Sequence, residues 1–419
     1  MQIYILCLPQ ENGSKVVHDV PLSLRRSLGE GELRLIMPHE SFESIGKRAL
    51  RLHKYAGGKF AIAAKVALKN AADLKLVYTP GVGAVSSYLA AHPGELRDYT
   101  MKGNSVAVVS DGSSVLGLGN IGPAGALPVM EGKCVIFKKF AGIDAVPIVL
   151  NTQDSDEIVR VVKAISPAFG GINLEDISAP RCFEIEARLK RELLIPVMHD
   201  DQHGTAIVVL AGLLNALKVT GKSLARIKIA INGAGAAGTA TAKLLCLAGA
   251  RNVIVCDRNG TIYRGRRGLG KYKGELARLT NPKNEKGDLA SAMRHADVFI
   301  GLSGPNLVSE AMVRSMERSA IVFALANPIP EIMPDAAKRA GARVIATGRS
   351  DFPNQINNSI VFPGVFRGAL DNRVRAITDK MKQKAASAIA SLVPHPSPTK
   401  IIPRMFNPRL VKAIAAAIR

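Results

Sequence analysis

The stretch IKIAINGAGAAGTATAKLLCLAGARNVIVCD, residues 227–257, decides the fold of this chain. Its β-branched start at 227–232 predicts a strand, the small residues at 233–238 predict a tight turn, and the apolar run at 239–249 predicts a helix. A second strand is expected at 252–256. A strand, a glycine turn, a helix and a parallel strand together make one unit of a doubly wound α/β fold.

The turn carries the glycine spacing of a dinucleotide site. Gly233 allows the tight turn, Gly235 lets a pyrophosphate approach the backbone, and Gly238 lets helix and strand pack closely. An acidic residue, Asp257, ends the next strand 19 positions after Gly238, as such sites require. The alternative is a Gly/Ala-rich helix start that serves packing alone. The candidate cofactor-binding residues of the turn are Gly233, Ala234, Gly235, Ala236, Ala237 and Gly238.

The residues after the second strand leave the choice of cofactor open. Asp257 would accept hydrogen bonds from the adenosine ribose, which favours NAD slightly over NADP. The segment that follows is strongly basic and begins with Arg258, and an arginine there could hold a 2′-phosphate beside the aspartate. A solvated basic loop is the simpler interpretation of that segment.

Apolar runs elsewhere extend the α/β pattern on both sides of the turn. Further strands are expected at 106–111, 146–151, 170–176, 195–200, 297–303, 320–327 and 342–348, and helices at 37–57, 154–165, 180–193 and 205–219. The prediction is an α/β protein with an N-terminal substrate and metal domain and a doubly wound, Rossmann-like NAD(P)-binding domain. The expected divisions are a poorly structured extension at 1–36, the two domains at 37–203 and 204–375, and a helical segment at 376–419. Met37 is a candidate for the true start.

Composition limits the class of protein. The chain has 419 residues, of which 47% are hydrophobic and 21% charged, as in soluble globular proteins. No uncharged apolar run reaches the roughly 18–20 residues of a membrane span, and the N-terminus lacks the features of a signal peptide. The five cysteines form no CxxC pair, which favours free thiols in a cytoplasmic protein.

The net charge of +22 is high and attracts polyanions. The sequence shows no basic block with interleaved aromatic residues, no zinc knuckle and no RNA-binding signature, and aromatic residues are only 5%. A nucleic-acid partner is therefore not expected, and a basic surface that faces anionic metabolites is the simpler interpretation.

Two acidic pairs follow successive strand candidates. Glu175 and Asp176 end one, and Asp200 and Asp201, in HDDQHGTA at 199–206, end the next. Neighbouring parallel strands would bring four carboxylates to one edge, where they would repel one another unless a cation lay between them. Oxygen ligands select Mg²⁺ or Mn²⁺. A helix N-cap is the alternative for a single pair. His199 and His203 are expected to support the site rather than bind the ion.

Other polar residues near apolar runs are candidates for catalysis and binding. Lys133 lies in MEGK before the apolar run CVIF, which suggests a strand and a lowered pKa suited to a base. Tyr78 precedes a Pro/Gly turn in YTPGVG. Asn327, Asn357 and Asn358 follow later strands, where their amides could bind a carboxylate or the nicotinamide, or make ordinary Asx turns.

Together these stretches resemble the malic enzymes, in the small form found in bacteria and archaea. The motifs, in chain order, are VYTPGVG, NSVAVVSDGSSVLGLGNIGP, LPVMEGKCVIFKKFAGIDAVPI, FGGINLEDISAPRCFEIE, VMHDDQHGTAIV, INGAGAAG, IVFALANPIPEI and ATGRSDFPNQINNSIVFPGVFRGALD. The resemblance covers about residues 40–410. It implies a homodimer that converts L-malate to pyruvate and CO₂ while reducing NAD⁺ or NADP⁺, with Mg²⁺ or Mn²⁺ bound.

The resemblance also implies roles for single residues. Lys133 would be the general base, supported by Asp200, and Tyr78 would be the general acid. The metal ligands would be Glu175, Asp176 and Asp201, and the substrate and nicotinamide contacts would be Asn327 and Asn358, with Asn357 beside them. Larger members hold the substrate carboxylate with an arginine in the SDG loop, where this chain has Ser113 and Ser114.

Two other functions remain open at this point. One is a single half-reaction, as in an oxaloacetate decarboxylase or a 2-hydroxyacid dehydrogenase. The other is a basic nucleotide- or nucleic-acid-binding protein on the same fold, since fold alone does not establish activity.

Overall fold

The computed structural model describes residues 42–419. The expectations for the extension at 1–36, for Met37 as a start and for Cys7 lie outside the described residues. The chain divides into two compact units at Gly58, and each is treated by itself. In the first unit the helix expected at 37–57 is present as α2, Phe42–Ala56.

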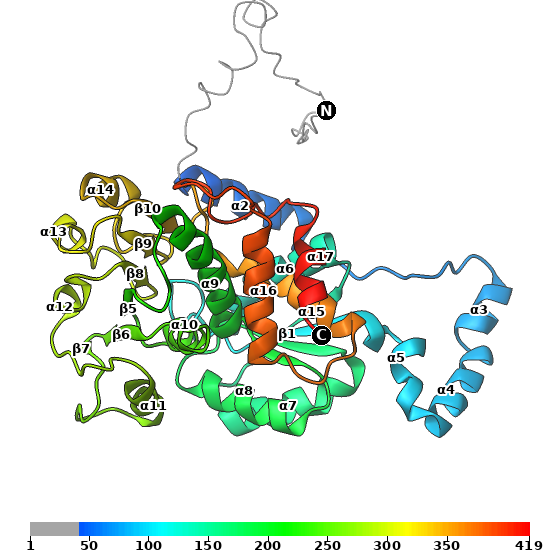
Figure 1. Ribbon diagram of the computed structural model, residues 1–419. Coiled ribbons are helices and arrows are strands. Elements are labelled where there is room, and N and C mark those ends of the chain that lie inside the picture. Colours follow the sequence, from blue (N-terminus) through cyan, green and yellow to red (C-terminus); the bar gives the residue numbers. More distant parts are fainter. Residues whose placement is uncertain (1–41) are drawn as a thin grey trace, which may run out of the picture. The chain divides into compact units, whose positions relative to one another are not determined.

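The second unit begins with short helices and then forms a four-stranded parallel sheet of order β2-β1-β3-β4 (Figure 1). The strands are β1 Ser105–Ser110, β2 Asp144–Val149, β3 Gly171–Leu174 and β4 Val197–His199. Alternate residues of β1 face opposite layers, with Val106 and Val108 in one buried cluster and Ala107 and Val109 in another. This sheet is therefore covered on both faces, which explains its unbroken apolar runs.

Helices form the two layers around this first sheet. On one face lie α7, Ser155–Ile165, and α8, Arg181–Glu192, and on the other lies α6, Gly122–Ala141. The expected helices at 154–165 and 180–193 are confirmed.

The second sheet contains the glycine turn and has the order β10-β9-β8-β5-β6-β7. Its strands are β5 Lys228–Asn232, β6 Asn252–Asp257, β7 Gly260–Thr261, β8 Val298–Gly301, β9 Ile321–Ala324 and β10 Val344–Thr347. All neighbours pair in parallel except β6 and β7. The doubly wound fold is confirmed. The sequence did not predict β7, because a two-residue strand that directly follows a turn at 258–259 carries no periodic signal.

The remaining helices cover the second sheet and fill the space between the sheets. The helices are α9 Asp200–Thr220, α10 Ala236–Leu247, α11 Lys271–Leu279, α12 Leu289–Met293, α13 Glu310–Arg314, α14 Pro334–Arg339, α15 Phe362–Asp371, α16 Asp379–Ser391 and α17 Leu410–Ala417. One buried cluster runs continuously from β1 and α6 through α9 to β5, β8 and β9. The two sheets thus share a core, which holds their carboxyl edges in fixed positions.

Helix α9 has 21 residues and a mean hydropathy of 1.4, which would suffice by length and composition to cross a membrane. It is 67% buried inside the protein, and it is the one such helix within residues 42–419. Asn215 on this helix donates to the carbonyl oxygens of Ala390 and Ile401, both at 2.9 Å. Its environment is that of a core helix.

Two consecutive helices near the start of the second unit have no buried residue. These are α3, Ala71–Val77, and α4, Gly81–Ala91, which precede the short α5, Leu96–Tyr99. They are joined by the cis peptide bond between Thr79 and Pro80. Figure 1 shows α3 and α4 in pale blue, well away from the two sheets. Their apolar side chains, Leu76 and Tyr78 among them, are exposed.

Candidate active site

The two acidic pairs meet at the carboxyl edge of the first sheet. Leu174 at the end of β3 pairs with His199 at the end of β4, so the residues that follow are brought side by side. One oxygen each of Glu175, Asp176 and Asp201 lies within 4.8 Å of the others. The strand order thus produces the cluster that the sequence predicted.

Burial makes this cluster of carboxylates unfavourable on its own. Desolvation, followed by the charges of Asp201 and Glu175, raises the pKa of Asp176 to about 9. Burial likewise raises the pKa values of Glu175 and Asp201. The Oδ2 atom of Asp176 is buried and has no hydrogen-bond partner in the described chain. An all-oxygen set with an unpartnered buried oxygen fits a hard divalent cation such as Mg²⁺ or Mn²⁺.

Asp200 differs from these three carboxylates because it has a lysine as its hydrogen-bond partner. Its Oδ2 atom accepts from Lys133 Nζ at 2.7 Å, and the same ammonium lies 2.9 Å from Glu175 Oε1. Burial raises the pKa of Asp200 to about 7 against the opposing effect of Lys133. The helix-cap interpretation is wrong in one respect. Asp200 and Asp201 form the first turn of α9, but His199 is the N-cap and no side chain caps the helix.

Two expectations for Lys133 are wrong. The lysine lies in the middle of helix α6 and not before a strand, because Met130, Cys134, Phe137 and Ala141 repeat at helical spacing and are buried. Its pKa is raised and not lowered. Burial alone would lower it, but Asp200, Glu175 and Asp201 outweigh that effect. The missing information was the position of these carboxylates, which lie at least 42 residues away in sequence.

The two histidines of HDDQHGTA differ in their surroundings. His203 Nε2 lies 3.0 Å from Glu186 Oε2, and Lys190 Nζ lies 2.7 Å from Glu186 Oε1. His199 is fully buried, with Nε2 3.6 Å from Asp201 Oδ2. His203 therefore belongs to an ion-paired group on α8, whereas His199 lies behind the carboxylate cluster.

The glycine turn connects β5 to α10. Gly233 has a φ of +117°, and a Cβ atom there would lie 2.4 Å from the carbonyl oxygen of Leu302. At Gly238 a Cβ would lie 1.8 Å from the carbonyl oxygen of Gly233. At Gly235, the first residue before α10, a Cβ would meet nothing within 4 Å. Two glycines thus serve the fold, while the space at Gly235 suits a ligand at the helix N-terminus.

This difference predicts opposite outcomes for two substitutions. Gly238→Ala should lower the melting temperature by several degrees, because its methyl group would collide with backbone. Gly235→Ala should leave the melting temperature unchanged and weaken cofactor binding about tenfold or more, because its methyl group enters only the ligand space. Thermal unfolding and titration with NAD⁺ would test both, and unchanged cofactor binding in Gly235→Ala would contradict the assignment of the site.

Asp257 ends β6, and both of its carboxylate oxygens accept hydrogen bonds from neighbouring groups. Arg266 Nη2 lies 2.7 Å from Oδ1 and 2.9 Å from Oδ2, and Lys273 Nζ lies 2.5 Å from Oδ2. The backbone N–H of Asn259 also donates to Oδ1. These donors outweigh the effect of burial and lower the pKa of Asp257. Arg258, the cation that the sequence suggested, is exposed, and the aspartate is held by two others.

The three candidate asparagines have different positions. Asn358 Oδ1 lies 3.4 Å from Lys133 Nζ and so reaches the lysine and its carboxylates. Asn357 makes an Asx turn, with Oδ1 accepting from the N–H of Ser359. Asn327 follows β9 and precedes a cis proline. A Cβ atom on Gly117 would lie 1.9 Å from the carbonyl oxygen of Asn327, so loops that follow strands of the two sheets meet there.

Two further residues near the site were not predicted. Glu331 is fully buried, and its two oxygens accept from the N–H groups of Ser303 and Ala326, each at 3.1 Å, which ties together the loops after β8 and β9. Arg181, at the start of α8, donates to Asp111 Oδ2 at 2.9 Å, and its buried Nε has no partner in the described residues. Only Asp111, at the end of a predicted strand, carried a signal in the sequence.

Tyr78 is not part of this arrangement. It is the C-cap of α3 and is 66% exposed. Figure 1 shows α3 lying apart from α6, which carries Lys133. Within one copy of the chain, the structure therefore does not bring the expected acid and base together.

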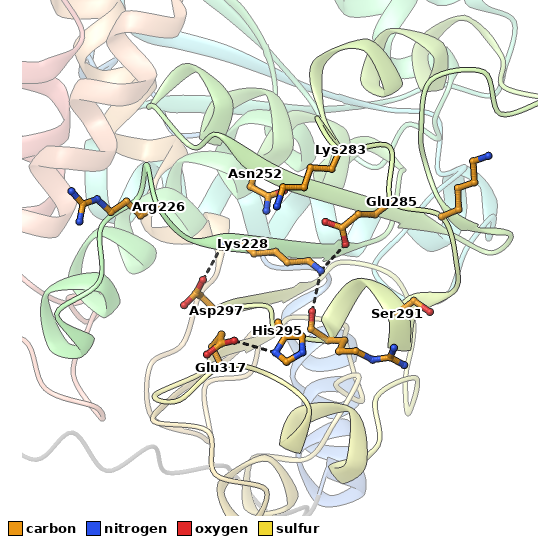
Figure 2. Close-up of a pocket in the computed structure, with 11 residues that line it drawn as sticks. Arg226, Lys228, Asn252, Lys283, Glu285, Ser291, His295, Asp297 and Glu317 are labelled. Carbon is orange, nitrogen blue, oxygen red and sulfur yellow. Dashed lines mark hydrogen bonds and ion pairs between the residues drawn. The ribbon is translucent and has the colours of Figure 1, made fainter.

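A cavity of about 770 Å³ lies elsewhere, at the amino edge of the second sheet (Figure 2). It is lined by Lys228 and Asn252, the first residues of β5 and β6, and by Asp297 before β8. Lys228 Nζ pairs with Glu285 Oε2 at 2.8 Å, and His295 pairs with Glu317. Ligands of doubly wound folds bind at the carboxyl edge, so this polar cavity is separate from the candidate site.

Comparisons with known proteins agree with these features. The family profile "Malic enzyme, N-terminal domain" matches residues 57–190, and "Malic enzyme, NAD binding domain" matches residues 202–418. A bifunctional malic/malolactic enzyme of Bacillus subtilis is 54% identical over 90% of this chain and 92% of its own length. An NADP-dependent malic enzyme of Halomonas elongata is 46% identical over 86% and 89%. The crystal structure of an NAD-dependent malic enzyme from Thermotoga maritima superposes with a TM-score of 0.86, at 48% identity, over 88% of this chain and 98% of that one.

Proposed function

This chain belongs to the malic enzyme family and catalyses the oxidative decarboxylation of malate with NAD or NADP, and from that premise we propose which residues carry the reaction. The observation that supports the assignment most directly is Lys133 at 2.7 Å from Asp200, beside three clustered carboxylates at the carboxyl edge of the first sheet. The two alternatives, a single half-reaction and a nucleic-acid-binding protein, are not favoured.

Glu175, Asp176 and Asp201 would hold the divalent ion. Their donor set and the unpartnered Oδ2 of Asp176 support this proposal. When bound, such an ion supplies positive charge for the negative charge that develops on the substrate as CO₂ leaves, and the nicotinamide accepts the hydride. Mg²⁺ and Mn²⁺ both fit oxygen ligands.

Lys133 would accept the proton of the C2 hydroxyl group. Its ammonium is held by Asp200, and Asn358 lies 3.4 Å away, which fixes the direction in which it can reach substrate. Without an ion, the carboxylates keep the lysine protonated. A divalent cation among Glu175, Asp176 and Asp201 would oppose their negative charge, lower the pKa of Lys133 and so allow it to act as a base.

The proton that returns to C3 would come from Tyr78 of a second copy of the chain. The site needs an acid, and Tyr78 is 66% exposed on a pair of helices that buries none of its own residues. Exposed apolar side chains on these helices and on the stretch that leads into them, such as Leu76 at 76% and Ile62 at 86%, would be covered by a partner. We therefore propose a homodimer in which each copy lends this segment to the other.

Mixing two inactive variants tests this exchange. Tyr78→Phe lacks the acid, and Lys133→Ala lacks the base. In a hybrid dimer with exchanged segments, one site has both lesions and the other has none. Co-refolding equal amounts should therefore recover roughly a quarter of the wild-type activity, since about half the dimers are hybrids with one intact site. Each variant refolded alone is the control. No recovery, with hybrids confirmed by two affinity tags, would mean that tyrosine and lysine act within one copy.

The overall function is tested by following reduced cofactor with L-malate and assaying pyruvate in parallel. The expected result is equimolar pyruvate and reduced cofactor with Mn²⁺ present, and loss of both in EDTA. Cofactor reduction without pyruvate would indicate a simple dehydrogenase. Activity that persists in EDTA would contradict the metal assignment.

The cellular location of this enzyme is also a proposal, and we place it in the cytoplasm. Cys134, Cys182, Cys246 and Cys256 are free thiols, as in proteins of the reducing cytoplasm. We expect no nucleic-acid partner.

A further inference from the structure

A buried carboxylate joins two loops at the carboxyl edge of the second sheet. Glu331 is fully buried, and within residues 42–419 it forms no ion pair. Its Oε1 atom accepts from the N–H of Ser303 and its Oε2 atom from the N–H of Ala326, each at 3.1 Å. Burial raises the pKa of Glu331, and these N–H groups oppose that effect. Because a buried carboxyl group destabilises a fold unless its hydrogen bonds compensate, the role of Glu331 lies in the two loops that it joins.

The ends of β8 and β9 explain why these loops need an acceptor. Gly301 and Ala324 are the last paired residues of the two parallel strands. Beyond them, the N–H groups of Ser303 and Ala326 point to the carboxylate of Glu331 and not to a neighbouring strand. A Cβ atom on Gly301 would lie 2.5 Å from Glu331 Oε1, so the carboxylate lies directly on the end of β8. It supplies the acceptors that the sheet no longer provides.

Glu331 also closes the loop that carries Asn327. The bond from the N–H of Ala326 to Glu331 joins the first residue of the loop 326–331 to its last. Asn327 is exposed, and in the part of the chain that the structure describes its side-chain amide makes no hydrogen bond. A Cβ atom on Gly348, after β10, would lie 2.7 Å from Asn327 Nδ2. The amide is therefore available to a ligand, and its position depends on the loop that Glu331 closes.

The loop after β8 connects Glu331 to the glycine turn. Ser303 Oγ accepts from Asn232 Nδ2 at 2.7 Å. Asn232 is the last residue of β5 and directly precedes Gly233, where the glycine turn begins. Through Ser303, the carboxylate of Glu331 thus holds the loop of Asn327 in a fixed position relative to the proposed cofactor site.

We propose that Glu331 is a positioning residue for the reaction: its carboxylate closes the loop 326–331 and holds it on the loop after β8, so that the amide of Asn327 stays where it can contact substrate and nicotinamide. Glu331 itself touches neither, because it is fully buried. The inference rests on the proposed function and on the contact that the family resemblance gives Asn327. Such positioning matters because a displacement of about 1 Å can lower a rate about 10²-fold.

Glu331→Gln tests the inference because it keeps the shape of the side chain and removes one acceptor. Whichever way the new amide is turned, its NH₂ group faces the N–H of Ser303 or of Ala326 and cannot accept from it. We expect kcat/KM for malate to fall about 10–100-fold with Mn²⁺ and cofactor saturating. Initial rates over a range of malate concentrations, measured well below the melting temperature of each variant, give kcat and KM separately.

A double-mutant cycle with Asn327→Ala shows whether Glu331 acts through this asparagine. Asn327→Ala should lower kcat/KM at least as much as Glu331→Gln, and both should change the same constant, kcat or KM. The double variant should match Asn327→Ala within about threefold, since the side chain that Glu331 positions is then already absent. Losses that multiply would overturn the inference, and so would wild-type kinetics in Asn327→Ala. A wild-type enzyme that forms no pyruvate would instead contradict the proposed function.

Asp297→Asn is the matched control for a simple loss of stability. Asp297 precedes β8 at the opposite edge of the same sheet, and its carboxylate accepts from the N–H of Lys228 at 2.8 Å and from Lys222 Nζ at 2.6 Å. This variant should melt at a lower temperature, as Glu331→Gln should, but its kcat/KM should change less than about threefold. A Glu331→Gln enzyme that melts lower and keeps wild-type kcat and KM would assign Glu331 a structural role alone and overturn the inference.

Discussion

Replacing Lys133 by arginine should lower the turnover of malate by roughly 10²–10⁴-fold, the usual contribution of a general base. Arginine preserves the positive charge beside Asp200 and Glu175, but it cannot lose its proton in a protein. The folded structure should therefore survive while the proton transfer does not. Initial rates at saturating malate and cofactor measure the loss, and thermal unfolding measures the stability.

Alanine at the same position tests the structural role of the positive charge separately from its role in proton transfer. Lys133→Ala leaves the buried carboxylates of Asp200 and Glu175 without their cation, so this variant should be less stable than Lys133→Arg when metal is absent. Lys139→Arg, on the exposed face of the same helix, is the control and should behave as wild type. A Lys133→Arg enzyme that keeps more than a tenth of wild-type turnover would rule out this lysine as the base.

Replacing Asp201 by asparagine should abolish the response of stability to metal. Wild type should gain several degrees in melting temperature on addition of Mn²⁺, because an ion that binds only the folded state stabilises it by mass action. Asp201→Asn keeps an oxygen that can accept from the N–H of Asp176, as Asp201 does at 2.8 Å, but it loses a charged ligand. Its metal affinity should fall by more than the roughly 10–100-fold that follows loss of an outer hydrogen-bond partner.

The same substitution should raise the melting temperature of the metal-free protein. Asp201, Glu175 and Asp176 repel one another in a buried site, and removing one charge relieves that repulsion. The combination of a more stable apoprotein and a lost metal response is specific to a cation site. Asp335→Asn is the control, since Asp335 is also in the first turn of a helix but is exposed. A metal-free Asp201→Asn that melts below wild type would instead assign this carboxylate a structural role.

Much of the architecture could be predicted because it follows from patterns within short segments of the sequence. The strands of both sheets other than β7 and helices α7, α8 and α10 lie within a few residues of their expected positions. Apolar runs with period 2 or 3.6 and glycine spacing are properties of short segments, so they can be interpreted without knowing the contacts. Helix α6 was missed around Lys133 because Gly132 and a β-branched run follow each other there, and local preference favoured a strand.

The site was predicted only as far as strand order allows. The approach of Glu175 and Asp176 to Asp201 follows from two adjacent parallel strands. The ion pair of Lys133 with Asp200 and the donors Arg266 and Lys273 on Asp257 do not, since each depends on which helix packs on which face. Glu331 carried no pattern at all, because its role depends on backbone groups of two loops.

The sequence by itself determined the kind of protein: a doubly wound dinucleotide fold, a carboxylate cluster suited to a divalent ion, and the residues available for acid and base. The tertiary structure alone decided the pKa shifts of Lys133 and of the carboxylates around it. A pKa depends on burial and on charges within a few ångströms, and these are set by packing between segments far apart in the chain. The same packing leaves Tyr78 exposed at the C-cap of α3, and this helix lies apart from α6, which carries Lys133 (Figure 1), a separation that no local pattern could have revealed.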